Sequence, residues 1–143
     1  MHKVSRRKCI SVLSIPLLTG CLSNNKSQPG LGEVYIRNEQ LTESNVAVTI
    51  SKNGEVLHEK EYKLSGTDNG SWGETSIREN WMGEYVPYEV TIEVDNIGET
   101  SYHTEDFLNM AGETQNIDCF ELTIVIGKGI VDFRPNAEES CTI

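Results

Sequence analysis

Cysteine, histidine and methionine are the side chains of this 143-residue chain that suit metal or redox chemistry. An electron-transfer copper site uses two His, one Cys and a weak axial Met, and one His and the Met usually follow soon after the Cys. Residues 120–123 after Cys119 contain neither, and no His or Met occurs further downstream. His58 and His103 lie far from the cysteines in the sequence, so only the fold could bring them together with a cysteine around a metal ion. A metal or redox carrier of cupredoxin-like type is therefore kept as the alternative interpretation. The main prediction is that the protein holds no metal and no cofactor.

Sequence motifs of common hydrolases and nucleotide-binding enzymes are absent from the chain. The GSWG segment at residues 70–73 is not a nucleophile elbow, and no zinc-protease motif or glycine-rich phosphate loop occurs. Adjacent acids such as Glu105 and Asp106 belong to a set of 22 acidic residues, which is typical of a solvated acidic surface. We therefore predict no catalytic residues and expect the protein not to be an enzyme.

Charge is distributed unevenly along the chain. The sequence has 12 Lys and Arg against 22 Asp and Glu, a formal net charge of −10. Residues 1–20 contain Lys3, Arg6, Arg7 and Lys8 and no acid, which leaves eight bases and 22 acids, or −14, for the remainder. Such a surface repels phosphate groups, so nucleic-acid binding through a basic patch is excluded.

The first twenty residues have the order of an export signal. Arg6 and Arg7 precede the apolar segment CISVLSIPLL at residues 9–18. This segment is shorter than the roughly 20 residues that span a bilayer. Pro16 would break the alternative structure, an ordinary buried N-terminal helix. We therefore predict a cleaved signal over residues 1–20.

The LTGC sequence at residues 18–21 resembles the lipobox of prokaryotic lipoproteins. This resemblance implies that Cys21 receives a lipid and becomes the first residue of the mature protein. The SRR sequence at residues 5–7 resembles a twin-arginine export signal. Residues 21–32 are polar and are expected to form a flexible tether. The implied partner is a membrane, and stable anchoring requires more than one acyl chain on Cys21.

Two cysteines remain when Cys9 leaves with the signal and Cys21 takes the lipid. Cys119 and Cys141 form an even pair in an exported domain, which predicts a disulfide. Closing a loop of about 20 residues would contribute on the order of 3 kcal/mol to stability. Two free thiols or a pair of metal ligands are the alternative.

From residue 33 onward, apolar residues alternate with polar ones, and no helical period persists. Seven or eight short strands in about 110 residues predict an all-β, antiparallel two-sheet sandwich of immunoglobulin-like type over residues 33–143. A small β-barrel is the alternative. The parity of the alternation also predicts the hairpin turns. These turns, each with one predicted pair, are residues 52–54 with Ile50 opposite Val56, residues 96–98 with Ile92 opposite Tyr102, and residues 127–128 with Ile124 opposite Val131.

A longer polar segment, residues 65–85, contains both tryptophans. We expect Trp81 to close one end of the core. Trp72 and Trp81, within this segment, are the predicted partner surface.

Three further features accompany the lipobox: the KNGEV turn at residues 52–56, Trp81 upstream of GEY at residues 83–85, and the DC pair at residues 118–119 with Cys141 near the end. With the acidic all-β pattern, they are similar to small exported lipoproteins of halophilic archaea in uncharacterised immunoglobulin-like families. The resemblance implies a location and a fold and supplies no catalytic residues.

The resulting hypothesis is a lipid-anchored, non-catalytic domain on the extracellular face of the cell membrane. It would bind an envelope protein or a polysaccharide through the surface around Trp72 and Trp81. We expect no nucleic-acid partner.

Overall fold

The computed structural model describes residues 28–68, 70–111 and 117–141. The predicted signal with Arg6 and Arg7, and the predicted lipid site Cys21, lie outside these residues. Sheet A has the strand order β4-β1-β7-β8, and sheet B has the order β3-β2-β5-β6. The described elements are β1 (Gly30–Asn38), β2 (Ser44–Lys52), β3 (Glu55–Leu64), β4 (Gly73–Ile77), β5 (Tyr88–Val94), β6 (Gly98–His103), α3 (Thr104–Ala111), β7 (Cys119–Ile126) and β8 (Val131–Glu138).

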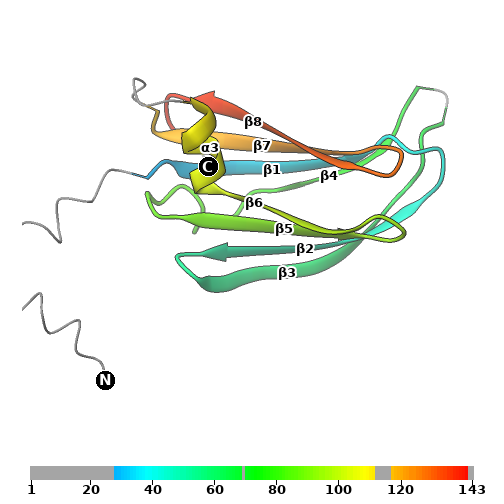
Figure 1. The fold of residues 1–143 in the computed structure, drawn as a ribbon, viewed down its shortest axis with the longest axis horizontal. Coiled ribbons are helices and arrows are strands. Elements are labelled where there is room, and N and C mark those ends of the chain that lie inside the picture. Colours follow the sequence, from blue (N-terminus) through cyan, green and yellow to red (C-terminus); the bar gives the residue numbers. More distant parts are fainter. Residues whose placement is uncertain (1–27, 69, 112–116, 142–143) are drawn as a thin grey trace, which may run out of the picture.

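The two sheets lie against each other as the layers of a sandwich (Figure 1). Paired strands are antiparallel, except that β1 and β7 run parallel. Each sheet ends in two edge strands and no barrel closes, so the predicted all-β two-sheet sandwich is confirmed. Immunoglobulin domains use the orders ABED and CFG. The likeness to them is therefore one of architecture, since β1 here lies between β4 and β7.

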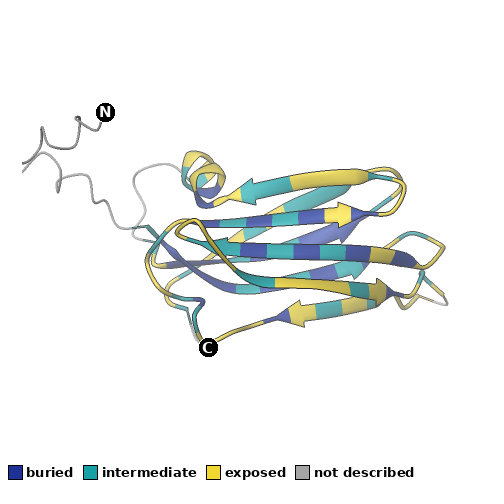
Figure 2. Cartoon of the chain, turned by 90° about the horizontal axis from the view of Figure 1, so that it is seen from below, coloured by how far each residue is buried: buried dark blue, intermediate teal, exposed yellow. Residues whose placement is uncertain are grey.

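Alternation along the strands places one face of each sheet in the core (Figure 2). In β2, Val46, Val48 and Ile50 have no exposed area, whereas the residues between them are partly exposed. Ile36 of β1 and Ile124 of β7 are equally buried in sheet A. Burying a side chain of this size contributes roughly 1.5–3 kcal/mol. These inward rows therefore hold the two sheets together.

The β2–β3 hairpin turns in two residues. Asn53 and Gly54 have φ angles of 52° and 88°, the left-handed pair that a type I′ turn requires. The register then shifts within the hairpin, so that Ile50 lies opposite His58. The predicted three-residue turn at residues 52–54 is wrong, because the extra residue is accommodated in a β-bulge of the strand.

The β5–β6 turn also differs in position from the prediction. Residues 95–97 join the strands, and Tyr102 lies opposite Val90 instead of Ile92. Because the register differs by two residues, Tyr102 still points to its predicted face.

The β7–β8 connection contains four residues instead of two. A hydrogen bond from the Gly127 amide to the Ile130 carbonyl, 2.9 Å long, closes it. Ile124 therefore lies opposite Phe133 instead of Val131. This shift is again even, so the predicted core faces are retained.

β1 begins before the predicted domain boundary. Gly30–Gly32 were expected to end the tether of residues 21–32, but they belong to the strand, and Leu31 between them has no exposed area. A Cβ atom at Gly30 would lie 2.5 Å from the carbonyl oxygen of Gly83. Glycine here permits close backbone packing, so its presence does not mark a linker at this position.

The helix α3 is the element that the sequence pattern did not predict. Asp106 Oδ2 accepts a hydrogen bond from the His103 amide at 2.8 Å, which caps the first turn. Phe107 is fully buried and stacks on Phe120 with ring centroids 4.6 Å apart. Eight residues are too few for a helical period to be visible beside the strand pattern. In the described part of the chain, no helix is long and apolar enough to cross a membrane.

Candidate functional site

Cys119 and Cys141 form a disulfide. Cys119 begins β7 and has no exposed area, and Cys141 lies three residues beyond the end of β8. Their Cα atoms are 5.1 Å apart, a normal separation for a disulfide. The predicted pairing is confirmed, and the bond fastens the C-terminal segment to sheet A.

Cys141→Ser should lower the free energy of unfolding by about 3 kcal/mol, because the bond closes a loop with a sequence separation of 22 residues. Denaturant unfolding with and without a reductant measures this effect. The reductant should lower the stability of the wild type by a similar amount and leave Cys141→Ser unchanged. A wild-type protein insensitive to reductant, with full reduction verified by thiol counting, would contradict the expectation.

The two tryptophans do not form one surface. Trp72 directly precedes β4, whose first residue pairs with Asn38 at the end of β1. Trp81 lies in the β4–β5 connection, where Gly83 packs against Gly30 at the beginning of β1. The predicted pair is therefore separated by the length of β1, roughly 30 Å at about 3.3 Å per residue.

The surroundings of the two tryptophans also differ. The Trp72 ring lies under the Arg37 guanidinium, with Cζ 4.6 Å from the ring centroid, and its Nε1 donates to Glu74 Oε1 at 3.1 Å. Its exposed fraction is 37%. Trp81 is partly buried and packs on the core, close to the expected end-closing role. Of the two tryptophans, Trp72 is the more exposed.

Four connections gather where β1 ends, and we call this region the loop end. A hydrogen bond of 2.8 Å from the Thr67 amide to the Gln40 carbonyl joins two of these connections. Large apolar side chains are exposed here, with exposed fractions of 77% for Leu41 and 60% for Ile130, in addition to Trp72. In Figure 1 the loop end lies opposite the end at which β1 begins, which we call the entry end. The connections of the loop end are residues 39–43, 65–72, 95–97 and 127–130.

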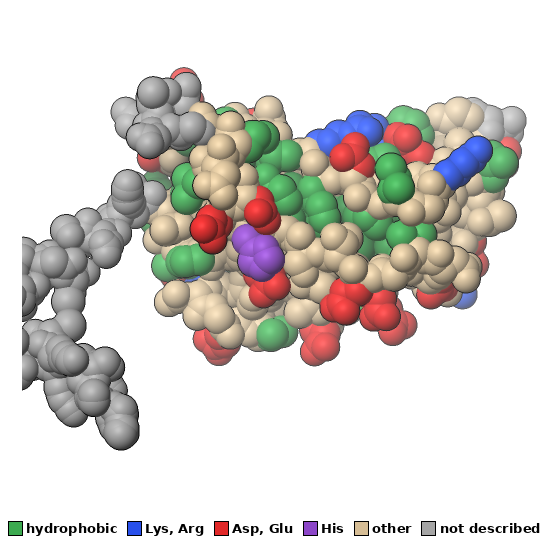
Figure 3. All heavy atoms as spheres, in the orientation of Figure 1, with side chains coloured by type: hydrophobic (Ala, Val, Ile, Leu, Met, Phe, Trp, Pro, Cys, Tyr) green, Lys and Arg blue, Asp and Glu red, His purple; other side chains and the backbone are tan. Residues whose placement is uncertain are grey.

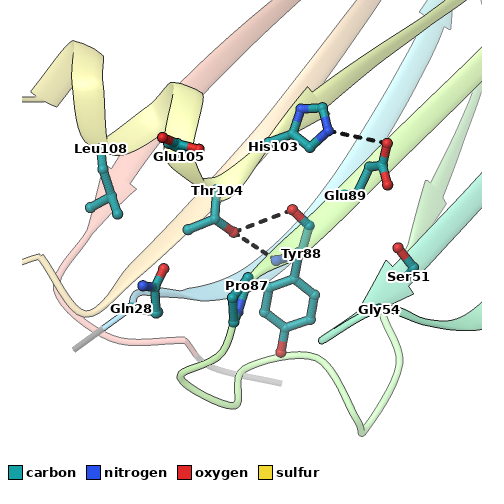
Figure 4. Close-up of a pocket in the computed structure, with 10 residues that line it drawn as sticks. All are labelled: Gln28, Ser51, Gly54, Pro87, Tyr88, Glu89, His103, Thr104, Glu105 and Leu108. Carbon is teal, nitrogen blue, oxygen red and sulfur yellow. Dashed lines mark hydrogen bonds and ion pairs between the residues drawn. The ribbon is translucent and has the colours of Figure 1, made fainter. Parts of the chain in front are cut away.

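A pocket of about 450 Å³ opens at the entry end of sheet B (Figure 4). Thr104 holds its wall together, because its Oγ1 accepts from the Tyr88 amide at 2.8 Å and donates to the Tyr88 carbonyl at 3.4 Å. Burial raises the pKa of the Tyr88 hydroxyl to about 12. The lining residues are Gln28, Ser51, Gly54, Pro87, Tyr88, Glu89, His103, Thr104, Glu105 and Leu108.

His103 stands at the rim of this pocket between two carboxylates. Its Nε2 is 3.1 Å from Glu89 Oε2, and its Nδ1 is 3.3 Å from Asp106 Oδ2. Each ring nitrogen of His103 therefore faces one carboxylate oxygen. These residues come from β5, β6 and α3, so their side-chain contacts tie the helix to the sheet edge. Figure 3 shows a histidine flanked by acidic side chains on this face.

The two histidines of the alternative interpretation lie apart. β3 carries His58 and β6 carries His103, and these strands are the opposite edges of sheet B. Three strand spacings of about 4.8 Å separate them. His58 Nε2 instead lies 3.0 Å from the Tyr62 hydroxyl. Within the described residues, no three His, Cys, Asp or Glu side chains are grouped to hold a metal ion.

Acidification should destabilise the protein through His58. Burial lowers the pKa of His58 from its usual 6.5, so the unfolded chain takes up this proton at a higher pH than the folded chain. The free energy of unfolding therefore falls as the pH drops from about 6.5 through the folded-state pKa. Denaturant unfolding at several pH values should show a flatter profile for His58→Gln. Tyr62→Phe, which keeps the ring buried, should retain the wild-type slope, and an unchanged slope in His58→Gln would contradict the assignment.

The pocket brings together residues that the sequence did not connect. Its walls come from the β2–β3 turn, from β5 and β6, and from α3. Thr104 followed by Glu105 and Asp106 is a helix-start signal that would have indicated α3, because acids are favoured in the first turn. The packing of that helix beside β5 has no local sequence signal.

Fold and site together define a small all-β two-sheet sandwich domain that contains the Cys119–Cys141 disulfide. No family model matches the chain, and no curated protein matches it. Among solved structures, a non-hemolytic pneumolysin from Streptococcus pneumoniae is similar at 11% identity with a TM-score of 0.33, over 76% of this chain and 24% of that chain. A Gram-negative toxin is similar at 15% identity with a TM-score of 0.32, over 76% and 23%. The chain spans about a quarter of these structures, and TM-scores this low carry no inference about function.

Proposed function

We propose that the protein is a lipid-anchored, non-catalytic domain on the extracellular face of the cell membrane, and that it binds an envelope protein through its loop end. The observation that carries the proposal is the exposure of Leu41, Ile130 and Trp72 at the end opposite the entry of the chain. A contiguous exposed apolar patch is typical of an interaction surface, and we propose that these three side chains act together as one.

The position of the proposed anchor supports this orientation. Six residues lie between Cys21 and Gln28, the first described residue, so the seven steps along the chain can span at most about 25 Å. A lipid on Cys21 would therefore hold the entry end near the bilayer. β1 runs from the entry end to the loop end, so the loop end would face away from the membrane.

A protein partner fits this surface better than a polysaccharide. Leu41 and Ile130 are the most exposed large apolar side chains of the loop end, and neither offers a hydrogen-bonding group. A sugar surface presents hydroxyl groups, which lose hydrogen bonds against such side chains. Trp72 could stack on a sugar, but Arg37 lies over its ring. Apolar contact with a protein surface is the interaction that the three side chains share.

The test compares two double variants of the full chain in the membranes of cells that produce it. Leu41→Ser with Ile130→Ser changes the loop end, and Val56→Ser with Met110→Ser removes exposed side chains of comparable size elsewhere. After chemical crosslinking and affinity capture, the amount of a captured loop-end partner should fall at least tenfold in the Leu41→Ser, Ile130→Ser variant. It should be unchanged in the Val56→Ser, Met110→Ser variant. Trp72→Ala should also reduce the amount of captured partner. Equal capture by all variants, with unchanged thermal unfolding, would contradict the proposal.

A further inference from the structure

We propose that the entry-end pocket binds a primary ammonium group on an alkyl stem, as carried by a lysine side chain of a partner polypeptide. The pocket has the size of a small-ligand site, since such sites measure about 300–1,000 Å³. Pro87 and Leu108 line it with apolar groups (Figure 4). These groups suit a hydrocarbon stem.

The charged groups of the pocket select a cation. Glu89 and Glu105 lie on either side of His103 and Thr104 in Figure 4. Among the described residues that line the pocket there is no Lys or Arg. Glu89 already pairs with His103, whereas the side chain of Glu105 has no hydrogen-bond or ion-pair partner in the described part of the chain. An anion would meet the two carboxylates Glu89 and Glu105 here, whereas both carboxylates attract a cation.

The geometry favours an ammonium group over a metal ion. A transition metal needs several ligand atoms at short, fixed distances, and the described His and carboxylate groups are not arranged to supply them. An ammonium group has three donors on a freely rotating centre and tolerates looser geometry. Its stem can also lie along apolar surface while the charge reaches a carboxylate at the rim.

This inference does not depend on the proposed function of the loop end. The pocket lies at the entry end and uses different residues, so each can fail while the other stands. The proposed function would be tested by capture of a protein, and the pocket is tested with a small compound.

The experiment uses the full chain labelled with 15N and titrated at low ionic strength with Nα-acetyl-lysine methylamide. Chemical-shift changes should include the amides of Tyr88 and Thr104. Nα-acetyl-norleucine methylamide, which has a similar stem and no charge, should bind at least tenfold more weakly. Shifts of equal size with the norleucine compound, or none with the lysine compound, would overturn the proposal.

Matched charge variants locate the binding. Glu105→Gln should weaken binding of the lysine compound about tenfold, the effect of losing one charge-assisted hydrogen bond. Glu99→Gln removes the same charge from β6, near the loop end, and should change the affinity less than twofold. Equal weakening by both variants would mean that the overall acidic field attracts the compound, and would overturn a specific site. The amide spectrum of each variant shows directly whether it is folded.

Discussion

Asn38→Asp should lower the free energy of unfolding by about 3–5 kcal/mol at pH 7. Asn38 ends β1 and has no exposed area. Its Nδ2 donates to the carbonyl oxygens of Thr42, Leu64 and Ser65 at 2.9, 3.2 and 3.0 Å. A carboxylate cannot donate, so these oxygens would lose their donor and face a buried negative charge. Because Leu64 belongs to β3, the change breaks a link between the two sheets next to the loop end.

Lowering the pH should recover part of this loss. A buried carboxyl group without a cation has a raised pKa, so the folded variant keeps a proton that the unfolded chain releases above about pH 4. The free energy of unfolding of the variant therefore falls as the pH rises through its folded-state pKa. Asn53→Asp, the same change in an exposed turn, should stay within about 0.5 kcal/mol of the wild type. Denaturant unfolding measures both, and equal stability of the two variants at pH 7 would contradict the role of Asn38.

Phe107→Ala should destabilise the protein by about 3–5 kcal/mol. Phe107 is the fully buried side chain of α3, and its stacking on Phe120 fastens the helix to sheet A. Removing the ring leaves a cavity. It also removes the aromatic contact with Phe120, which contributes about 0.5–1.5 kcal/mol. Thermal unfolding should show a midpoint lower by roughly 10–20 °C.

Met110 provides the matched control for this helix. Its side chain is 59% exposed, so Met110→Ala should change the stability by no more than about 0.5 kcal/mol. If Phe107→Ala were as mild as Met110→Ala, the helix would not depend on its contact with the core. Thr104, Glu105 and Leu108 of this helix line the entry-end pocket. Phe107→Ala should therefore also weaken binding of the lysine compound in that pocket.

The layered fold could be predicted because its signal is local. Val46, Val48 and Ile50 alternate with polar or small residues, and burial on one face of a sheet requires this period of two. The same pattern in β5 and β7 gives the inward face of each strand. The disulfide could be predicted by counting cysteines, given a lipid on Cys21.

The turn positions and the start of the first strand were not predicted correctly, because the local sequence is compatible with more than one structure at each of these places. At Asn53 and Gly54, a two-residue turn with a bulge and a three-residue turn both satisfy the alternation. Gly30 could serve as a linker or as a point of close packing, and only its approach to Gly83 decides between these roles. The parallel pairing of β1 with β7 joins segments far apart in the sequence, which no local pattern records.

The positions of the candidate surfaces could not be predicted for the same reason. Trp72 was identified by residue type, but its separation from Trp81 depends on the direction of β1. Leu41 and Ile130 are single exposed apolar residues in turns. The sequence offers no reason to assign them to one surface, because only the fold brings their turns to the same end of the domain. The pocket combines Glu89, His103 and Glu105 through the packing of α3.

A lipid on Cys21 would hold the entry end at the membrane and leave the loop end free, and the intact mass of the protein extracted from membranes tests this most directly. We predict a chain that begins at Cys21, carries the mass of more than one acyl chain, and lacks two hydrogen atoms because of the disulfide. A mass equal to the unprocessed 143-residue chain, or to a chain beginning at Cys21 without lipid, would contradict the anchored orientation.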